Sequence, residues 1–428
     1  MHNTRWRYIF LVFCAGFSFA AAQQHPSDDD ASLRHARAIL RTSPLIDGHN
    51  DLPWFIREHA SPPGDVAAYD LRSRVKGQTD LPRLRAGQVG GQFWSVFIPG
   101  DLKDRHFARV QLEQIDIARQ IIDRYPEALA PALSSDDAER AFRKGRIASF
   151  IGIEGGHAIE NSLGALRMYY ALGVRYMTLT HNSTLDWADA ALDTARHNGL
   201  TPFGKEVVRE MNRLGMLVDL SHVSDRVMSN ALDVSEAPVI FSHSSARALS
   251  NHPRNVPDSI LVRVPANGGV VMVTFVPEFV SAETAAWDET VKNEFAGIRD
   301  TRARDSLRTI YIRLHPRPKA TLAQVADHIA YIRKIAGVDH VGIGGDFDGS
   351  DETPVGLSDV SCYPALFAEL IRRGWPDADL KKLAGLNVLR ALGDASRVAR
   401  RIRAERGPST ATIEVLDRDI KERSKHTD

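Results

Sequence analysis

Short apolar runs recur along the chain, and stretches with the apolar spacing of helices separate most of them. The runs are rich in β-branched residues and bounded by Gly, Ser or Pro, which is typical of strands buried in a parallel sheet. Eight of them occur, at 45–47, 93–98, 148–153, 175–180, 216–220, 239–242, 269–275 and 340–344. Alternating strands and helices predict parallel pairing through right-handed crossovers, and eight units are the number in a (β/α)8 TIM-type barrel of the α/β class. A doubly wound open sheet is the alternative, because the sequence alone does not show closure.

One predicted helix carries clear boundary signals. Thr201 is a suitable N-cap, Pro202 fits the first helical position, and Gly215 fits the stop. The apolar stripe between them consists of Val207, Val208, Met211 and Leu214. Residues 32–40 are predicted to form a shorter helix that leads into the first strand.

The segment 277–322 interrupts the repeat after the seventh strand. It is long, charged and only weakly helical in pattern. An insertion of this kind usually forms a lid or a subunit contact, and the sequence does not choose between them. We therefore expect a single barrel domain at 23–428 that carries one long insertion.

Composition narrows the range of partners. The chain has 428 residues, of which 43% are hydrophobic and 25% charged, as in ordinary soluble globular proteins. Its formal net charge is zero, so it lacks the basic character expected of a nucleic-acid-binding protein. Small neutral or zwitterionic ligands fit this balance better.

Residues 1–22 have the pattern of a secretory signal peptide, with two arginines, an apolar stretch at 8–19 and three alanines before the expected cleavage site. A retained anchor is the less favoured alternative, because the stretch is shorter than the roughly 20 residues that span a bilayer. The polar end at 421–428 lacks the tail of a GPI signal. We expect an exported, soluble protein, periplasmic or secreted, with no stable membrane anchor. Only Cys362 would remain, so no intramolecular disulfide is expected.

Histidines and acids stand where several predicted strands stop. His49 and Asp51 are two residues apart, so in an extended strand end they point the same way and can bind one ion together. Glu154, His222 and His243 hold equivalent positions, and the carboxyl ends of barrel strands meet at one face. Imidazole and carboxylate suit zinc, and one carboxylate can bridge two ions. The pattern predicts a binuclear metallohydrolase with two Zn²⁺ per chain, although in isolation the first pair would also fit a polar turn and Glu154 a helix-capping acid.

Longer motifs surround these positions. They are DGHNDLPW at 47–54, EGGH at 154–157, LTH at 179–181, DLSH at 219–222, FSHS at 241–244, RNVPD at 254–258 and GGDFDG at 344–349. With them the chain resembles the membrane, or renal, dipeptidase family of amidohydrolase-like metal barrels. The resemblance extends from about residue 46 to 392, which is nearly all of the expected mature chain.

The resemblance implies a role for each matching metal ligand. His49 and Asp51 are expected to bind one zinc, Glu154 to bridge, and the pair His222 and His243 to bind the second zinc. Two zinc ions lower the pKa of a shared water toward about 7, so that a metal-bridging hydroxide can attack an amide carbonyl near neutral pH.

Three further residues take roles from the same resemblance. Asp346 is expected to act in catalysis by taking the proton of the water and passing it to the departing amine. His181 is expected to act in catalysis and substrate binding by donating to the carbonyl oxygen as negative charge develops there. Arg254 is expected to bind the substrate carboxylate with its planar fork.

The implied activity is hydrolysis of the peptide bond of dipeptides, with tolerance of a C-terminal D-residue. A homodimer is expected from the family, whereas the disulfides and lipid anchor of animal members are not carried over. A related amidohydrolase acting on N-acyl amino acids or other small amides is the nearest alternative. A metal-stabilised binding protein without turnover is an alternative of another class.

The motifs contain further polar and aromatic residues. Asp348 and His157 are expected to support ligands and loops from behind. Trp54 fits either the mouth of the pocket or the core, and no role is assigned to His252 or Asp47.

Overall fold

The computed structural model describes residues 31–102 and 104–418, so the predicted signal peptide at 1–22 lies outside the described residues. Nine strands of the described part form one sheet. They are β1 (Leu45–Asn50), β2 (Val89–Ser95), β3 (Leu129–Pro131), β4 (Ile147–Glu154), β5 (Val174–Thr178), β6 (Leu217–Asp219), β7 (Val239–Phe241), β8 (Val270–Val273) and β9 (Val341–Ile343).

Eight of these strands close into a parallel barrel. Strand β1 pairs with β2 on one side and with β9 on the other. Strand β2 also pairs with β4, where Phe93 lies opposite Phe150, and this pairing completes the ring. The predicted (β/α)8 barrel is therefore confirmed, and the doubly wound alternative is excluded. Strand β3 pairs with β4 outside the ring and was not predicted, since it has three residues and ends in Pro131.

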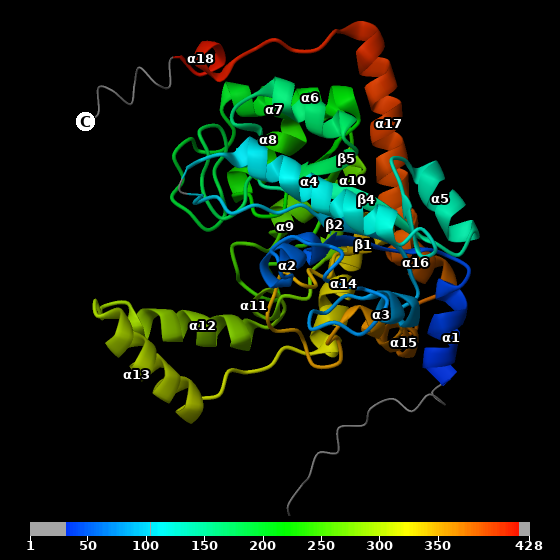
Figure 1. Cartoon of the computed structure of the whole chain (residues 1–428), viewed down its shortest axis with the longest axis vertical. Coiled ribbons are helices and arrows are strands. Elements are labelled where there is room, and N and C mark those ends of the chain that lie inside the picture. Colours follow the sequence, from blue (N-terminus) through cyan, green and yellow to red (C-terminus); the bar gives the residue numbers. More distant parts are fainter. Residues whose placement is uncertain (1–30, 103, 419–428) are drawn as a thin grey trace, which may run out of the picture.

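Helices surround the barrel and connect its strands (Figure 1). The described helices are α1 (Ala31–Leu40), α2 (Leu52–His59), α3 (Leu81–Ala86), α4 (Phe107–Arg124), α5 (Ser135–Arg143), α6 (Leu163–Ala171), α7 (Pro202–Leu214), α8 (Asp225–Val234), α9 (Asp258–Leu261), α10 (Val264–Asn267), α11 (Pro277–Val280), α12 (Ala282–Phe295), α13 (Thr301–Leu314), α14 (Leu322–Ala336), α15 (Tyr363–Arg372), α16 (Asp377–Lys381), α17 (Asn387–Glu405) and α18 (Ile413–Leu416).

Helix α7 begins and ends where the sequence predicts. The hydroxyl of Thr201 accepts a hydrogen bond from the backbone N–H of Gly204, and Pro202 occupies the first turn. Gly215 ends the helix with φ 88°, a left-handed conformation that glycine adopts without strain.

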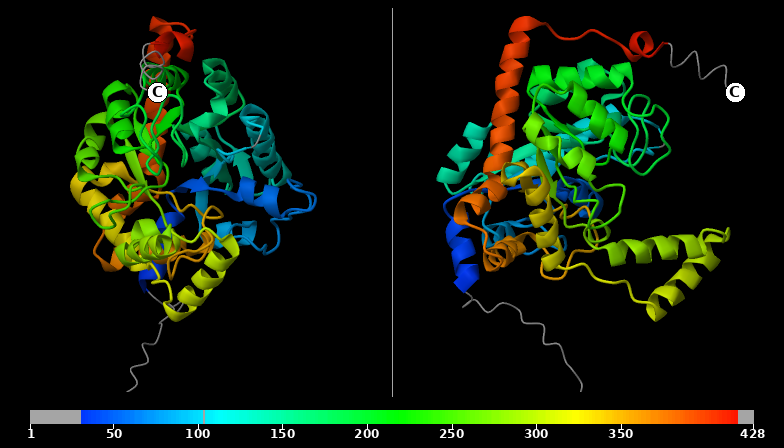
Figure 2. Two further views of the ribbon diagram at one scale, coloured as in Figure 1. Left: turned by 90° about the vertical axis from the view of Figure 1, so that its left-hand side faces the viewer. Right: turned by 180° about the vertical axis from the view of Figure 1, so that it is seen from behind.

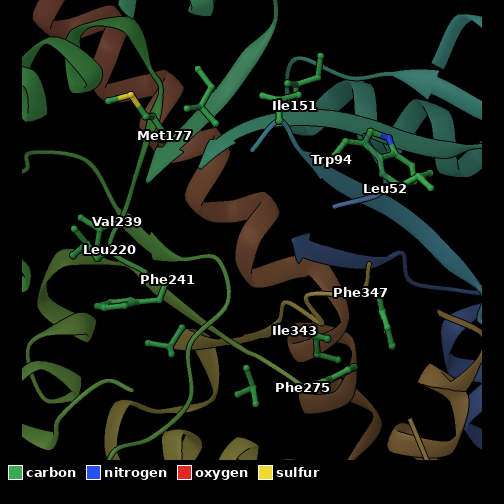
Figure 3. Packing of buried hydrophobic residues seen from close by; sticks show 14 of the residues in the cluster. Leu52, Trp94, Ile151, Met177, Leu220, Val239, Phe241, Phe275, Ile343 and Phe347 are labelled. Carbon is green, nitrogen blue, oxygen red and sulfur yellow. The ribbon is translucent and has the colours of Figure 1, made fainter. Parts of the chain in front are cut away.

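Alternate residues of the strands contribute to two apolar clusters. Phe150 and Tyr176 belong to a cluster that also contains Leu389 and Leu392 of α17, so this helix packs against the residues that fill the barrel. Ile151 and Met177 belong to the larger cluster shared with the surrounding helices, part of which is shown in Figure 3. Burying each such large apolar side chain stabilises the fold by roughly 1.5–3 kcal/mol.

The insertion after the seventh barrel strand forms α11 and the two longer helices α12 and α13. In Figures 1 and 2 the α12–α13 pair extends away from the barrel. Arg317, on the returning segment, pairs with Asp288 of α12, with Glu278 of α11 at 3.0 Å and with Glu352 at 2.7 Å. These ion pairs tie the base of the helix pair to the loops at the rim of the barrel.

Among residues 31–102 and 104–418, no helix combines the length and the apolar character needed to cross a membrane.

Candidate metal centre

The five predicted metal ligands meet at the carboxyl ends of the barrel strands. His49 lies in β1 and Asp51 directly after it, while Glu154 is the last residue of β4. His222 follows β6 and His243 follows β7. All five are buried, and the most exposed of them, His222, is 7% accessible. Residues as far apart in sequence as His49 and His243 therefore share one site, as the sequence predicts.

Glu154 lies between His49 on one side and the pair His222 and His243 on the other. Its Oε1 is 2.8 Å from Nε2 of His222 and 3.3 Å from Nε2 of His243. Its Oε2 faces the other way, 3.5 Å from Nε2 of His49. Burial alone would raise the pKa of this carboxyl, but the neighbouring histidines His49, His222 and His243 hold it well below its ordinary value. An ionised carboxylate with one oxygen toward each group has the arrangement needed to bridge two cations.

The imidazoles of His222 and His243 present lone pairs to each other. Nδ1 of His222 lies 3.1 Å from Oδ1 of Asn182, and Nδ1 of His243 lies 2.8 Å from the hydroxyl of Ser242. Burial lowers the pKa of both histidines well below the ordinary value, which favours neutral rings. With the ring proton on Nδ1, both Nε2 atoms are bare acceptors, and they are 2.8 Å apart. A cation bound between these two nitrogens and Glu154 would remove the repulsion between their lone pairs.

At the carboxyl end of β1, two polar atoms of the proposed ligands are buried without a hydrogen-bond partner among the described residues. They are Nε2 of His49 and Oδ1 of Asp51. Nε2 of His49 lies 3.3 Å from Oδ2 of Asp51 and 3.9 Å from Oδ1 of Asp346. Unpaired buried polar atoms are costly, so their convergence here fits a bound metal ion. Nitrogen and carboxylate oxygen donors of this kind suit zinc.

Three side chains that orient the histidines were not predicted. Tyr176 places its hydroxyl 2.9 Å from Nδ1 of His49. Its ring has room because Gly152 lacks a side chain, and an added Cβ there would lie 2.1 Å from Cζ of Tyr176. Asn182 and Ser242 serve the other two histidines, as described above. Only Ser242 is adjacent in sequence to the histidine that it contacts. Tyr176 and Asn182 are distant along the chain from His49 and His222, so the sequence carries no local signal for them.

Asp346 lies beside the proposed metal ligands. The loop after β9 is held to β1 because the N–H of Asp346 donates to the carbonyl of His49 at 3.1 Å. Asp346 has φ 61° and His222 has φ 67°. Residues other than glycine rarely adopt these left-handed backbone conformations, which concentrate at functional sites. Burial is the main reason that the pKa of Asp346 lies well above its ordinary value, and the charges of Asp51 and Glu154 act in the same direction.

His181 approaches the cluster from the loop after β5. Its Nε2 is 4.0 Å from Oε1 of Glu154, and its ring lies 4.8 Å from that of Phe97. Burial lowers its pKa, and the charge of Arg254 acts in the same direction. The neutral ring can donate one hydrogen bond into the site.

Arg254 is a buried cation beside the cluster. Arg254 is 1% exposed. Among the described residues, no carboxylate lies within salt-bridge distance of its guanidinium. Nη1 and Nη2 make only long hydrogen bonds, 3.5 Å to Ser244 and 3.4 Å to the carbonyl of His243. Nε has no hydrogen-bond partner. Burial lowers the pKa of Arg254 to about 10, which still leaves it charged at neutral pH. A buried, unpaired guanidinium is expected to bind an anion.

A cavity of about 750 Å³ opens onto this cluster. Asp51, Glu154, His222 and Arg254 line its floor, and the remaining walls include Trp54, Phe97, His181, His252, Phe279, Asp346 and Asp348. Trp54 thus lies in the pocket wall, and His252 packs against the ring of Phe279 at 4.5 Å.

The remaining motif residues form hydrogen bonds with neighbouring segments of the chain. His157 donates from Nε2 to the carbonyl of Ile98 at 3.1 Å, and Asp348 accepts a hydrogen bond from the backbone N–H of Gln78. Asp47 lies beneath the site, where it accepts from Tyr363 and from the N–H of Gly345. These contacts fix the loops that carry the site.

Comparisons with known proteins identify the family and support the fold. The model of the membrane dipeptidase family, peptidase family M19, matches residues 33–406. The structure is similar to that of the probable dipeptidase PvdM from Pseudomonas aeruginosa, with a TM-score of 0.76 and 25% identity over 86% of this chain and 99% of that one. It is also similar to a metallo peptidase from Rhodobacter sphaeroides that was crystallised with a phosphinate mimic of L-Ala-D-Ala, with a TM-score of 0.69 and 23% identity over 82% of this chain and 99% of that one. The family match covers most of the sequence, and the chain therefore belongs to the membrane dipeptidase family.

Proposed function

We propose that the protein is a binuclear zinc dipeptidase that hydrolyses the peptide bond of dipeptides. The observation that carries this proposal is the position of Glu154, with Oε1 toward His222 and His243 and Oε2 toward His49. His49 and Asp51 would hold one zinc ion, His222 and His243 the other, and Glu154 both. When bound, the two ions would supply a shared water whose pKa is lowered toward about 7.

Asp346 is suited to move the proton. Its carboxylate lies at the edge of the ligand cluster, 3.9 Å from His49, and lines the cavity. A carboxyl whose pKa is raised can accept a proton during attack and return it to the leaving amine. His181 on the neighbouring wall can donate to the carbonyl oxygen as negative charge develops.

Arg254 would select the substrate by its carboxylate. The guanidinium lies beside the ligand cluster and has no acidic partner among the described side chains, so the carboxylate of a short substrate can fill that role. A guanidinium beside the proposed metal ligands would favour substrates whose carboxylate lies close to the scissile bond. This requirement favours dipeptides over longer peptides.

Tolerance of a C-terminal D-residue is part of the proposal. It is supported by the similar Rhodobacter sphaeroides enzyme, which binds a mimic of L-Ala-D-Ala. Export after removal of residues 1–22 and assembly as a homodimer also remain proposals, which a mass measurement of the native secreted protein would test.

A panel of substrates tests the proposed function. Values of kcat/KM are compared for L-Ala-L-Ala, L-Ala-D-Ala and N-acetyl-L-alanine with zinc present. We expect both dipeptides to be cleaved faster than the N-acyl amino acid. Faster cleavage of N-acetyl-L-alanine would favour the alternative amidohydrolase, and no cleavage of any of them would favour a binding protein without turnover. Cleavage of the L,L-dipeptide alone would reject tolerance of a D-residue.

A further inference from the structure

Asp219 is a fully buried carboxylate behind the proposed metal centre. It ends β6, has no exposed surface and is not among the residues that line the cavity. Its Oδ1 accepts hydrogen bonds from the backbone N–H groups of Ser221 at 3.1 Å and Ser242 at 2.8 Å. Its Oδ2 accepts from the hydroxyls of Thr178 and of Ser242, the latter at 2.6 Å. Four donors are enough to stabilise a buried carboxylate.

The hydroxyl of Ser242 connects this carboxylate to a proposed metal ligand. A hydroxyl has one proton, and that of Ser242 is donated to Asp219. Its oxygen, 2.8 Å from Nδ1 of His243, must therefore accept a hydrogen bond from the ring. The ring proton of His243 then lies on Nδ1, and Nε2 is left with a free lone pair. That lone pair faces Oε1 of Glu154 at 3.3 Å.

We propose that Ser242 and Asp219 are positioning residues, which hold His243 in the one tautomer that can bind a metal ion through Nε2. The inference rests on the proposed metal centre. It concerns the series of hydrogen bonds that links Asp219, Ser242 and His243, in which each residue fixes the hydrogen-bonding direction of the next.

A second contact fixes the same histidine from its backbone. The N–H of His243 donates to the hydroxyl of Ser221 at 3.0 Å, and that residue is itself bound to Asp219 through its N–H. The hydroxyl of Ser221 also lies 3.1 Å from that of Ser244, which Nη1 of Arg254 reaches at 3.5 Å. Asp219 thus supports both the ring and the backbone of His243.

The other two imidazoles have different partners. Nδ1 of His49 meets the hydroxyl of Tyr176, and Nδ1 of His222 meets Asn182. Among the described residues, no side-chain carboxylate is hydrogen-bonded to either partner. The ring of His243 is accordingly the one whose tautomer is set by a buried negative charge.

Zinc binding by Ser242→Ala tests the proposal against a matched control. The control is Thr178→Val, which removes the other hydroxyl from the same oxygen of Asp219 without touching a histidine. Metal-free wild type and variants are titrated with zinc in competition with a chromophoric chelator, and their unfolding temperatures are measured without metal. Loss of a residue that is hydrogen-bonded to a metal ligand typically weakens metal binding about 10- to 100-fold. We expect this loss at one of two zinc sites in Ser242→Ala, and wild-type affinity at both sites in Thr178→Val.

Asp219→Asn tests the direction of the hydrogen bonds that run from His243 through Ser242 to Asp219. Its amide can donate to the oxygen of Ser242, which would turn the hydroxyl proton toward Nδ1 of His243 and leave the ring proton on Nε2. We expect zinc affinity to fall at least as far as in Ser242→Ala. Histidine-selective ¹⁵N NMR of the metal-free proteins should show Nδ1–H for His243 in the wild type and Nε2–H in Asp219→Asn.

The outcomes separate this inference from the proposed function. Wild-type zinc affinity in Ser242→Ala, or the Nδ1–H form retained in Asp219→Asn, would overturn the inference and leave the metal centre intact. Equal losses in Ser242→Ala and Thr178→Val would also overturn it, because general damage around Asp219 would then explain both. A wild type that binds no zinc would overturn the proposed function, and the inference with it.

Discussion

The guanidinium of Arg254 lies over the ring of Phe279, with Cζ 5.1 Å from the ring centroid. The aromatic face partly compensates the buried charge while leaving the donors on the edge of the guanidinium free for a ligand. Phe279 and Arg254 line the same cavity, so this pairing places the cation where a substrate carboxylate can reach it.

Arg254→Met should weaken the use of dipeptides that have a free carboxylate. A charged hydrogen-bond pair contributes about 1.5–3 kcal/mol, so kcat/KM should fall about 10- to 150-fold. The dipeptide amide is the matched substrate because it lacks the carboxylate. The variant and the wild type should cleave the amide at similar low rates, and an equal fall for acid and amide would show that Arg254 has another role.

Asp346→Asn should lower kcat without removing the metals. Loss of a general acid–base group typically costs about 10²- to 10⁴-fold in rate. Asp351→Asn is the control, since Asp351 is an exposed carboxylate that lines the same cavity. Zinc content and steady-state rates are measured for both variants. Wild-type rates in Asp346→Asn would refute its assignment to proton transfer.

His181→Asn should lower kcat more than it changes KM. The proposed hydrogen bond forms with a carbonyl oxygen that becomes negative only during attack, and removing such a donor costs about 10²- to 10³-fold in kcat. Steady-state kinetics with L-Ala-L-Ala distinguish the two parameters. A raised KM with unchanged kcat would mean that His181 only helps to bind the substrate.

His157 should make the fold less stable in acid. Burial lowers its pKa to about 4 from the ordinary 6.5. Between these pH values the unfolded chain binds the additional proton, so the free energy of unfolding falls as the pH decreases through this range and levels off below it. The contribution is fully present above pH 6.5 and amounts to about 3 kcal/mol.

Urea unfolding of the wild type and His157→Gln at pH 7 and pH 4 measures this contribution. The stability advantage of the wild type should shrink by about 3 kcal/mol at the lower pH. Comparing the two proteins cancels the titration of the other histidines. An advantage that stays constant with pH would contradict the account.

Much of the fold could be predicted because each strand and helix leaves a local pattern. Thr201, Pro202 and Gly215 marked the ends of α7, and apolar runs marked the eight barrel strands. Closure through β2 and β4 could not be predicted, because it depends on pairing between segments about sixty residues apart. Strand β3 is too short to show any periodicity.

The site divides in the same way. Histidines and acids at strand ends are conspicuous, so the five proposed ligands could be named from the sequence, and the structure brings them together. Tyr176 and Ser242 were not given a role, because buried tyrosines and serines are common and their partners are set by the barrel. The left-handed backbone of His222 and Asp346 is likewise imposed by tertiary contacts.

Zinc titration of the metal-free protein, with hydrolysis of L-Ala-L-Ala as the readout, tests the central claim most directly. The account predicts no hydrolysis without metal, a rise in rate that ends at two zinc ions per chain, and loss of activity on chelation. Full hydrolysis without metal, or none with two zinc ions bound, would contradict it.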